Sequence, residues 1–477
     1  MVRNLSAAGG ELYVVGGWLR DKMLDRPNSD LDIAAPKDPL KLAKSFSKAV
    51  SGHMITLDDD NKIYRVIVKD CGFLEYVDFA KFKGPDIVSD LRKRDFSVNS
   101  FAAKISKDGT LDLKNLIDPC GGAADLKKRS LRISYSKSFR DDPLRMLRAF
   151  RIAAETGFSI DPATLKAVKQ NSKLISDSAP ERVKDELIKI LSRDDSARWI
   201  TELESATLLE RLIPEIIPMK KSARNFYFHP KGLWQHCFET LVSMEALFLN
   251  LAEYFGQHAK EMSGHLETLV STGVNRKTVL KLTAILHDSA KPECAVRSGG
   301  KTRFLGHEEK GAAKAQKIFA RLKMGRKETQ IAKVLVENHM RPVSLSQTGT
   351  VTQRASFRLF RDIGDNTPDL LLLALADWHS YKRIKTNKPK NLKMQEAILR
   401  ELIARYYALS EKKDAPRLMD GNILMKKLKL KPGPIIGHLL KVTQEAQALG
   451  KIHNTAEAAA LASKELTRCA KKYKITL

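Results

Sequence analysis

Two aspartates near the start of the chain, Asp30 and Asp32, have the residue type and spacing that suit a magnesium ion. They stand two apart in an apolar context that predicts a strand, so both carboxylates project from one face. Before them, an apolar run, a glycine pair (Gly16 and Gly17) and a charged segment with Arg20 predict a strand, a tight turn and a helix. Such a turn lets the backbone approach a bulky anion, and the helix start and the arginine favour its charge. These features together indicate a nucleoside triphosphate held with two metals for nucleotidyl transfer.

The ordered combination of strand, Gly-Gly, Arg-Asp and Asp-x-Asp resembles the signature of the class II tRNA nucleotidyltransferases, a family of CCA-adding enzymes and bacterial poly(A) polymerases. The resemblance implies an α+β fold. A small N-terminal nucleotidyltransferase α/β head with a mixed sheet would be followed by an all-α neck, an HD-type body and a tail. It also implies Mg²⁺ as cofactor, CTP and ATP as substrates and tRNA as partner.

Four further residues of the predicted head match the family. Asp78 lies in a predicted strand of the same sheet, where the resemblance places a third acidic residue for a metal cluster; an exposed strand aspartate is the alternative. Arg94, Asp95 and Asn99 match the second family motif. There the arginine contacts the nucleotide, while the aspartate and asparagine help to fix the sugar.

A predicted helix further on carries arginines at every third position, Arg145, Arg148 and Arg151, which predicts a basic stripe on one face. A solvated face is the alternative. The segment resembles the family's Glu-Asp-x-x-Arg motif, with Asp141 in place of the glutamate. The resemblance makes Asp142 and Arg145 the base readers, because a carboxylate accepts from the exocyclic amino group of cytosine or adenine and a guanidinium donates to ring acceptors. Arg148 and Arg151 would support the helix and the triphosphate.

A second constellation of histidines and aspartates follows in the middle of the chain. A histidine and an aspartate side by side in an apolar helix are costly to bury without a metal or a partner. The series resembles the HD-domain phosphohydrolase signature, including two extra ligands of extended versions, and comprises His236, His287, Asp288, His307, His339 and Asp377. Imidazole and carboxylate suit a divalent transition metal, which acidifies bound water for phosphoester hydrolysis. An HD fold retained only as an RNA-binding body is the alternative.

The composition agrees with a nucleic-acid enzyme. The chain has 477 residues and a net charge of +27, with a pI near 9.7, and such a field attracts polyanions such as nucleic acid. No apolar run is long enough to cross a bilayer, and the N-terminus lacks the features of a signal peptide. The five cysteines are scattered, which indicates a reducing compartment. We therefore expect a cytoplasmic protein without a membrane partner; the oligomeric state is unknown from the sequence.

Composition and motif order divide the chain into four predicted parts. They are a nucleotidyltransferase head (1–137), a neck with base-selecting and RNA-binding helices (138–195), an HD-type helical body (196–410) and a basic helical tail (411–477). Lysines of the tail would hold RNA phosphates without reading sequence; a packed helix with a solvated lysine face is the alternative.

The resemblance predicts a template-independent enzyme that adds C, A or both to the 3′ end of tRNA, with a possible phosphohydrolase activity in the HD body. The segment between Asp78 and Arg94 is short. Many complete CCA-adding relatives have a longer flexible loop there, and CC-adding relatives lack it, so CC-only addition is one expected outcome. Poly(A) polymerase activity and an HD phosphohydrolase whose head only binds RNA are the alternatives.

Overall fold

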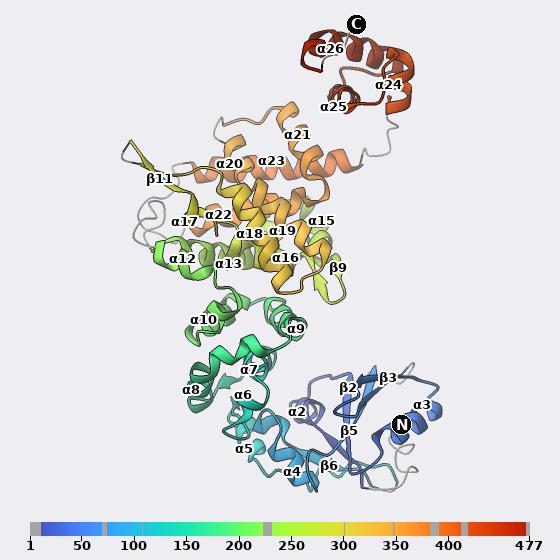
Figure 1. The fold of residues 1–477 in the computed structure, drawn as a ribbon, viewed down its shortest axis with the longest axis vertical. Coiled ribbons are helices and arrows are strands. Elements are labelled where there is room, and N and C mark those ends of the chain that lie inside the picture. Colours follow the sequence, from blue (N-terminus) through green and yellow to red (C-terminus); the bar gives the residue numbers. More distant parts are fainter. Residues whose placement is uncertain are drawn as a thin grey trace. The chain divides into compact units, whose positions relative to one another are not determined.

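The computed structural model describes residues 11–68, 74–106, 108–222, 231–299, 301–346, 349–381, 391–411 and 418–473 (Figure 1). The chain forms two compact units, Met1–Pro214 and Glu215–Leu477, which we describe separately. The division into four parts stays a prediction.

A six-stranded sheet forms the centre of the first unit, in the order β3-β4-β5-β2-β1-β6. Its strands are β1 (Tyr13–Val15), β2 (Asp30–Ala35), β3 (His53–Asp58), β4 (Ile63–Ile67), β5 (Tyr76–Lys81) and β6 (Ala102–Lys104). Strands β2 and β5 pair in parallel and the other neighbours pair antiparallel, so the predicted mixed sheet is confirmed. The predicted strand over 73–79 starts later than expected, and its first residue, Phe73, lies outside the described residues.

Helix α3 (Pro39–Ala49) covers one face of this sheet. Its buried residues Leu42, Ala43 and Phe46 follow helical spacing, and the ring of Phe46 lies 5.5 Å from that of Phe79 in β5. The apolar stripe of α3 therefore joins the core formed by alternating strand residues.

The first unit contains further helices, some between strands of the sheet and the others in a helical second half. They are α2 (Gly17–Met23), α4 (Ile87–Arg92), the 3₁₀ turn η1 (Ser97–Asn99), α5 (Gly122–Lys127), α6 (Ser138–Asp141), α7 (Arg145–Thr156), α8 (Pro162–Asn171), η2 (Ser172–Asp177), α9 (Pro180–Leu191), α10 (Ser196–Ser205) and α11 (Leu208–Leu212). A small parallel pair, β7 (Ser130–Leu131) and β8 (Ser159–Ile160), accompanies them. Helix α7 ends at Gly157, whose φ of 72° is left-handed, and it packs against α9.

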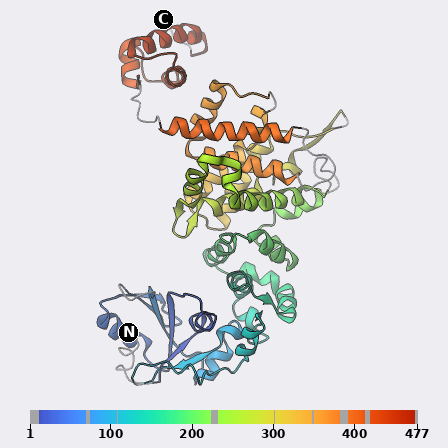
Figure 2. The same ribbon diagram turned by 180° about the vertical axis from the view of Figure 1, so that it is seen from behind.

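The second unit is predominantly helical (Figure 2). Its helices before the tail are α12 (Ile216–Lys221), α13 (Leu233–Leu249), α14 (Leu251–Phe255), η4 (Gly256–His258), α15 (Ala259–Glu267), α16 (Arg276–Leu286), α17 (Lys291–Cys294), α18 (His307–Arg321), α19 (Arg326–Asn338), α20 (Met340–Ser346), α21 (Gln353–Ile363), η5 (Gly364–Asn366), α22 (Thr367–Ser380) and α23 (Leu392–Glu411). Two antiparallel ribbons interrupt them, β9 (Leu269–Ser271) with β10 (Val274–Asn275) and β11 (Ala295–Ser298) with β12 (Lys301–Phe304).

The central helices of this unit pack in pairs, α13 beside α22 and α18 beside α19. Helix α22 contains the most apolar run of the sequence, and its residues Leu370–Ala376 are buried. This helix is apolar on all sides because neighbouring helices surround it. Among the described residues, none of the helices has the length and apolar character needed to span a membrane.

Three helices close the chain: α24 (Gly421–Leu428), α25 (Pro434–Ala448) and α26 (Thr455–Tyr473). The carboxylate of Asp420 caps α24 by accepting from the Ile423 backbone amide at 2.8 Å. The helices enclose a small apolar core of their own, which includes Leu424, Leu439 and Ala462. The packing of α25 against α26 therefore fixes the positions of the side chains that lie between these two helices.

Candidate functional site

The glycine turn and the aspartate pair meet at the edge of β1 and β2. Val15 pairs with Asp32 across the two strands, and Gly16 follows with φ 78° and ψ −150°. A Cβ on Gly16 would lie 2.6 Å from Asp32 Oδ2 and 3.3 Å from Arg94 Nη1. The Asp32 carboxylate and the Arg94 guanidinium therefore lie directly against the turn. Asp30 stands two residues earlier in β2 and so projects from the same face of the strand.

The charges around Asp32 fit a divalent cation. Burial raises the pKa of Asp32 to about 6; Arg94 and Arg148 oppose this effect, whereas Asp78 and Asp30 add to it. Three carboxylates thus lie close together on one face, where Arg94 and Arg148 compensate only part of the rise in the pKa of Asp32. Mg²⁺ binds through one or two such oxygen ligands together with substrate phosphates, and the pair Asp30 and Asp32 would hold it.

Asp78 lies beside Asp32, because these two residues pair in the parallel register of β2 and β5. Both of its oxygens accept from Arg65 of β4, from Nε at 2.7 Å and from Nη2 at 2.8 Å. The side chain is 16% exposed, so Asp78 is not the exposed strand residue considered as the alternative. Arg65, which the sequence did not single out, holds this carboxylate in place. The catalytic role of Asp78 stays a prediction.

Arg20 is a buried connector between two segments of the head. Its guanidinium donates to both oxygens of Asp21, at 2.9 and 2.8 Å, and to Asn99 Oδ1 at 2.9 Å. It is only 6% exposed, so it differs from the open triphosphate cation that the sequence suggested. Arg20 thus fixes α2 against η1 and orients Asn99. Its expected contact with nucleotide, like that of Gly17 in the first turn of α2, stays a prediction.

Asp95 joins the head to helix α7. Its Oδ1 accepts from Asn99 Nδ2 at 3.1 Å and from the Phe96 backbone amide at 2.9 Å, and its Oδ2 lies 2.9 Å from Arg148 Nη2. Burial raises the pKa of Asp95, but Arg148, the hydrogen bond from Asn99 and the charge of Arg145 outweigh that effect and lower the pKa. The residue is therefore a charged link between the motif at 94–99 and α7.

Arg145 is almost entirely enclosed at the start of α7, with 8% exposure. Its Nη1 donates to Tyr135 Oη at 2.9 Å and to Ser138 Oγ at 3.0 Å, and its Nη2 donates to the Lys93 carbonyl at 3.2 Å. Tyr135 Oη also donates to Asp141 Oδ2 at 2.8 Å. Tyr135 and Ser138 gave no signal in the sequence, because only the fold brings them to this arginine.

The arginines of α7 do not form a solvated face, so this alternative is wrong. Arg151 pairs with Glu186 Oε2 of α9 at 2.5 Å and with Glu155 Oε2 at 2.7 Å, and its side chain is 15% exposed. Asp142, by contrast, remains partly accessible just before the helix, where Arg182 Nη2 of α9 approaches its Oδ2 at 3.2 Å. The roles of Asp142 and Arg145 in base reading stay predictions.

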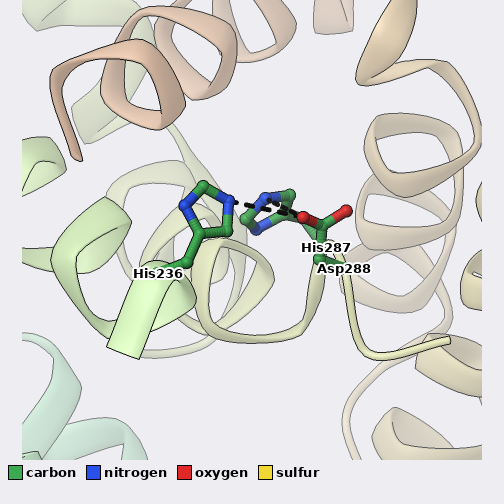
Figure 3. Close-up of side chains that lie close together, drawn as sticks. All are labelled: His236, His287 and Asp288. Atoms are coloured by element: carbon green, nitrogen blue, oxygen red, sulfur yellow. Dashed lines mark ion pairs between the residues drawn. The ribbon is translucent and has the colours of Figure 1, made fainter. Parts of the chain in front are cut away.

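The second constellation converges inside the second unit. His236 comes from α13, His287 and Asp288 from the end of α16, His307 from the start of α18, His339 from the end of α19 and Asp377 from α22. Figure 3 shows His236 and His287 directed at the Asp288 carboxylate, whose Oδ2 lies 3.3 and 3.4 Å from their Nε2 atoms.

Asp288 is shared between two groups of ligands. Its Oδ1 faces His307 Nε2 at 3.5 Å and His339 Nε2 at 3.3 Å, on the other side from His236 and His287. Asp377 Oδ1 lies 3.1 Å from His236 Nε2. All six predicted residues are thus brought together. Five of them form two potential metal groups, His236 with His287 and Asp288, and Asp288 with His307 and His339, and Asp377 lies beside His236.

The four imidazole rings are oriented by oxygens behind them. The Nδ1 atoms of His236, His287, His307 and His339 lie 3.1, 2.8, 2.6 and 2.7 Å from Ser380 Oγ and from the carbonyls of Ala284, Phe304 and Val336, respectively. A proton on Nδ1 leaves the Nε2 lone pair directed at the centre, which is the usual arrangement of metal-ligating histidines.

Several buried atoms of this centre lack a hydrogen-bond partner, which supports the fit of a metal. His287 Nε2, Asp288 Oδ1 and Asp377 Oδ1 are enclosed without one among the described residues. Burial raises the pKa of Asp288, but Lys291 and His287 outweigh this effect and lower it well below the usual value. Lys291 Nζ lies 2.5 Å from Asp288 Oδ2. A charged carboxylate, the imidazole nitrogens that face it and these open atoms form a donor set for a divalent cation.

Four family models match the chain in the predicted order. They are "Poly A polymerase head domain" over residues 12–132, "Probable RNA and SrmB- binding site of polymerase A" over 157–220, "HD domain" over 234–382 and "tRNA nucleotidyltransferase domain 2 putative" over 375–462. A chain that carries both a nucleotidyltransferase head and an HD body is thus the class of enzyme that the fold and the two centres define.

Curated relatives identify the family. The chain is 32% identical over 455 residues to an A-adding tRNA nucleotidyltransferase of Deinococcus radiodurans, with 94% of each chain covered. It is 27% identical over 475 residues to a CC-adding tRNA nucleotidyltransferase of Geobacter sulfurreducens, which covers 98% of this chain and 95% of that one. The chain belongs to the class II CCA-adding family of tRNA nucleotidyltransferases, and the predicted family is confirmed.

Solved structures agree on the fold. A CCA-adding enzyme in complex with ATP matches with a TM-score of 0.64 at 20% identity, over 98% of this chain and 94% of that one. The Thermotoga maritima CCA-adding enzyme complexed with tRNA matches with a TM-score of 0.61 at 20% identity and the same coverage. The α+β fold predicted from the sequence is therefore confirmed.

Proposed function

We propose that the protein adds C, A or both to the 3′ end of tRNA from CTP and ATP. The observation that carries this proposal is the contact of the Gly16 turn with the Asp32 carboxylate and the Arg94 guanidinium. This arrangement combines an open backbone for a triphosphate, a cation for its charge and a carboxylate face for metal. The excess of positive charge supports tRNA as the partner.

Each group has a distinct task in this proposal. Asp30 and Asp32 hold Mg²⁺, which supplies activation of the tRNA 3′-hydroxyl and charge neutralisation for the departing pyrophosphate. Arg94 binds the triphosphate beside the glycine turn. Asp95 and Asn99 orient the sugar, while Arg20 and Arg148 hold these two side chains from behind.

The base would be read at the start of α7. The Asp142 carboxylate accepts from the amino group of cytosine or adenine, and Arg145 donates to a ring acceptor. Guanine and uracil present a carbonyl at that position, which leaves the Asp142 carboxylate without a donor and disfavours them. Tyr135 and Ser138 hold the Arg145 guanidinium in one orientation.

Two partial activities have separate support. Only the segment 82–86 connects β5 to α4, so the long loop of many complete CCA-adding relatives is missing, which favours CC addition. The Deinococcus radiodurans relative, which is 32% identical over 94% of the chain, is an A-adding enzyme, and this favours addition of the final A.

Two tRNA substrates separate these activities. One ends at the discriminator base and the other ends in CC, and each is incubated with CTP, with ATP and with both. Extension of the first by two C residues alone supports CC addition, and extension of the second by one A alone supports A addition. Continued A incorporation would indicate poly(A) polymerase activity instead.

We also propose that the HD centre hydrolyses phosphoesters with a divalent transition metal held by its four histidines and two aspartates. The buried unpartnered atoms His287 Nε2, Asp288 Oδ1 and Asp377 Oδ1 support this proposal. A bound metal supplies a nucleophilic hydroxide near neutral pH. The lowered pKa of Asp288 keeps the shared carboxylate charged for this task.

Hydrolysis of a 2′,3′-cyclic nucleotide tests this activity with Mn²⁺, Co²⁺ or Ni²⁺. The wild type should hydrolyse it and Asp288→Asn should not, while both should extend tRNA equally. Equal tRNA extension shows that the variant is folded. Absence of hydrolysis by the wild type with every metal would support the alternative of an RNA-binding HD body.

A cytoplasmic location is also proposed. The cysteines of the described residues, Cys120, Cys237, Cys294 and Cys469, are free thiols, as expected in a reducing compartment. The fifth, Cys71, lies outside the described residues.

A further inference from the structure

A second kind of metal-ligand cluster lies in the tail, far along the sequence from the HD residues. Helix α25 contributes His438, and α26 contributes Glu465 and Cys469, which stand four apart and so share one helical face. His438 Nε2 lies 3.0 Å from Glu465 Oε1, Cys469 Sγ lies 3.3 Å from the same oxygen, and Sγ lies 3.6 Å from Nε2. One nitrogen, one oxygen and one sulfur atom therefore form a compact triangle.

We propose that His438, Glu465 and Cys469 bind a divalent transition metal of the Zn²⁺ type and clip α25 to α26. The dimensions of the triangle support this proposal. Zn²⁺ bonds of about 2.0–2.3 Å in a tetrahedron place an N–O edge at about 3.4 Å and the edges to sulfur at about 3.6 Å. The observed 3.0, 3.3 and 3.6 Å differ from these values by less than about half an ångström.

An ion pair between His438 and Glu465 is the simpler explanation, but it accounts for only one edge. The spacing of four along α26 explains why Sγ lies near the Glu465 oxygen, but the ion pair gives no reason for Sγ to lie 3.6 Å from the imidazole nitrogen of α25 as well. Thiolate and imidazole together select Zn²⁺-like ions over Mg²⁺.

The supporting helices are well suited to position this site. Leu439 follows His438 and Leu466 follows Glu465, and both leucines lie in the apolar core of the tail. Side chains of Glu465 and His438 are 16% and 32% exposed, so an ion can enter from solvent and keep water as its fourth ligand. Binding releases the Cys469 thiol proton and forms an S–metal bond, without any redox step. A small core gains stability from such a cross-link.

The full-length protein tests this proposal with Co²⁺ as the probe. Co²⁺ on a thiolate gives a sulfur-to-metal charge-transfer absorption, which imidazole and carboxylate ligands do not produce. The six predicted HD ligands include no cysteine, but Cys237 lies near Asp288 of that centre, so the band is assigned to the tail by its loss in a Cys469 variant and not by its presence alone. The wild type should show the band, and Cys469→Ser should lose it.

Matched variants make the result decisive. Cys120→Ser removes another partly exposed thiol and should keep the band. Glu465→Gln should weaken Co²⁺ binding by about tenfold or more while the Cys469 band remains detectable at high metal. A wild type without the band, or a band that persists in Cys469→Ser, would overturn the proposal. Neither outcome depends on the nucleotidyltransferase or phosphohydrolase assignments.

Discussion

Replacing Gly16 with alanine perturbs the head at the point where its glycine turn meets the metal-binding face. The added Cβ would lie 2.6 Å from Asp32 Oδ2, about 0.8 Å closer than the 3.4 Å at which ordinary van der Waals contacts of a Cβ begin. Because Asp32 has a short side chain, its carboxylate must move by a similar distance. A displacement near 1 Å in a reacting assembly costs about 100-fold in rate, so we expect a loss of this order in tRNA extension.

The same substitution also strains the backbone. Gly16 has φ 78° and ψ −150°, a region that L-residues rarely adopt, so alanine there costs about 1–3 kcal/mol of stability. Gly364 provides a matched control with φ 60° and ψ −134°, and a Cβ there would meet nothing within 4 Å. Gly364→Ala should therefore lose comparable stability and keep its activity.

The assay combines two measurements. Single-turnover incorporation of labelled CTP and ATP into tRNA gives the rate, and denaturant unfolding gives the stability of each variant. Wild-type rates in Gly16→Ala, or equal loss of rate in Gly16→Ala and Gly364→Ala, would refute the placement of Asp32 against the turn as the basis of activity.

Three further outcomes follow from the contacts around α7 and the HD centre. Arg145→Lys keeps the charge but cannot reproduce the forked guanidinium that reaches Tyr135, Ser138 and the Lys93 carbonyl. Discrimination of CTP and ATP against UTP and GTP should therefore fall by about 10-fold or more. Unchanged selectivity in competition assays would contradict base reading by this residue. The pKa of Asp95 is lowered in the folded protein, so its charged carboxylate stabilises the fold above its unfolded pKa, and this stability is lost as the pH falls through the folded pKa. The free energy of unfolding should therefore drop more steeply below about pH 5 in the wild type than in Asp95→Asn. Parallel pH profiles of the two proteins would contradict this account. His339→Ala removes one of the imidazoles that face Asp288 Oδ1. The number of transition-metal ions bound per chain and the rate of phosphoester hydrolysis should both fall, while the rate of tRNA extension stays within about twofold of the wild type. The same metal content in the variant and the wild type by elemental analysis would argue against His339 as a ligand.

Much of the fold was readable because it depends on local pattern. The alternation in Asp30–Ala35 predicted a strand with both aspartates on one face, and the structure has that strand in the centre of a mixed sheet. Helices α9 and α25 begin at Pro180 and Pro434, where proline in the first turn is a local signal for a helix start. These features require only neighbouring residues, so a single sequence contains them.

Features that depend on distant partners were not readable. Arg20 and Arg145 looked like accessible cations, but Asn99 and Tyr135 enclose them after folding. The HD residues were found through a family resemblance, whereas the oxygens that orient their rings, such as Ser380 Oγ behind His236, had no sequence signal. A tertiary contact changes the environment of a charged residue without changing its local pattern.

The central claim is that the carboxylates beside the glycine turn bind the metal needed for nucleotidyl transfer. The incorporation of labelled CTP and ATP into tRNA by the Asp32→Ala variant tests this claim most directly. The control variant is Asp60→Ala, because Asp60 is an exposed residue in a turn. Loss of metal stabilisation worth several kcal/mol corresponds to about a thousandfold lower rate, so Asp32→Ala should lose at least that much and Asp60→Ala should match the wild type. Incorporation by Asp32→Ala at the wild-type rate would contradict the account and leave a head that only binds RNA.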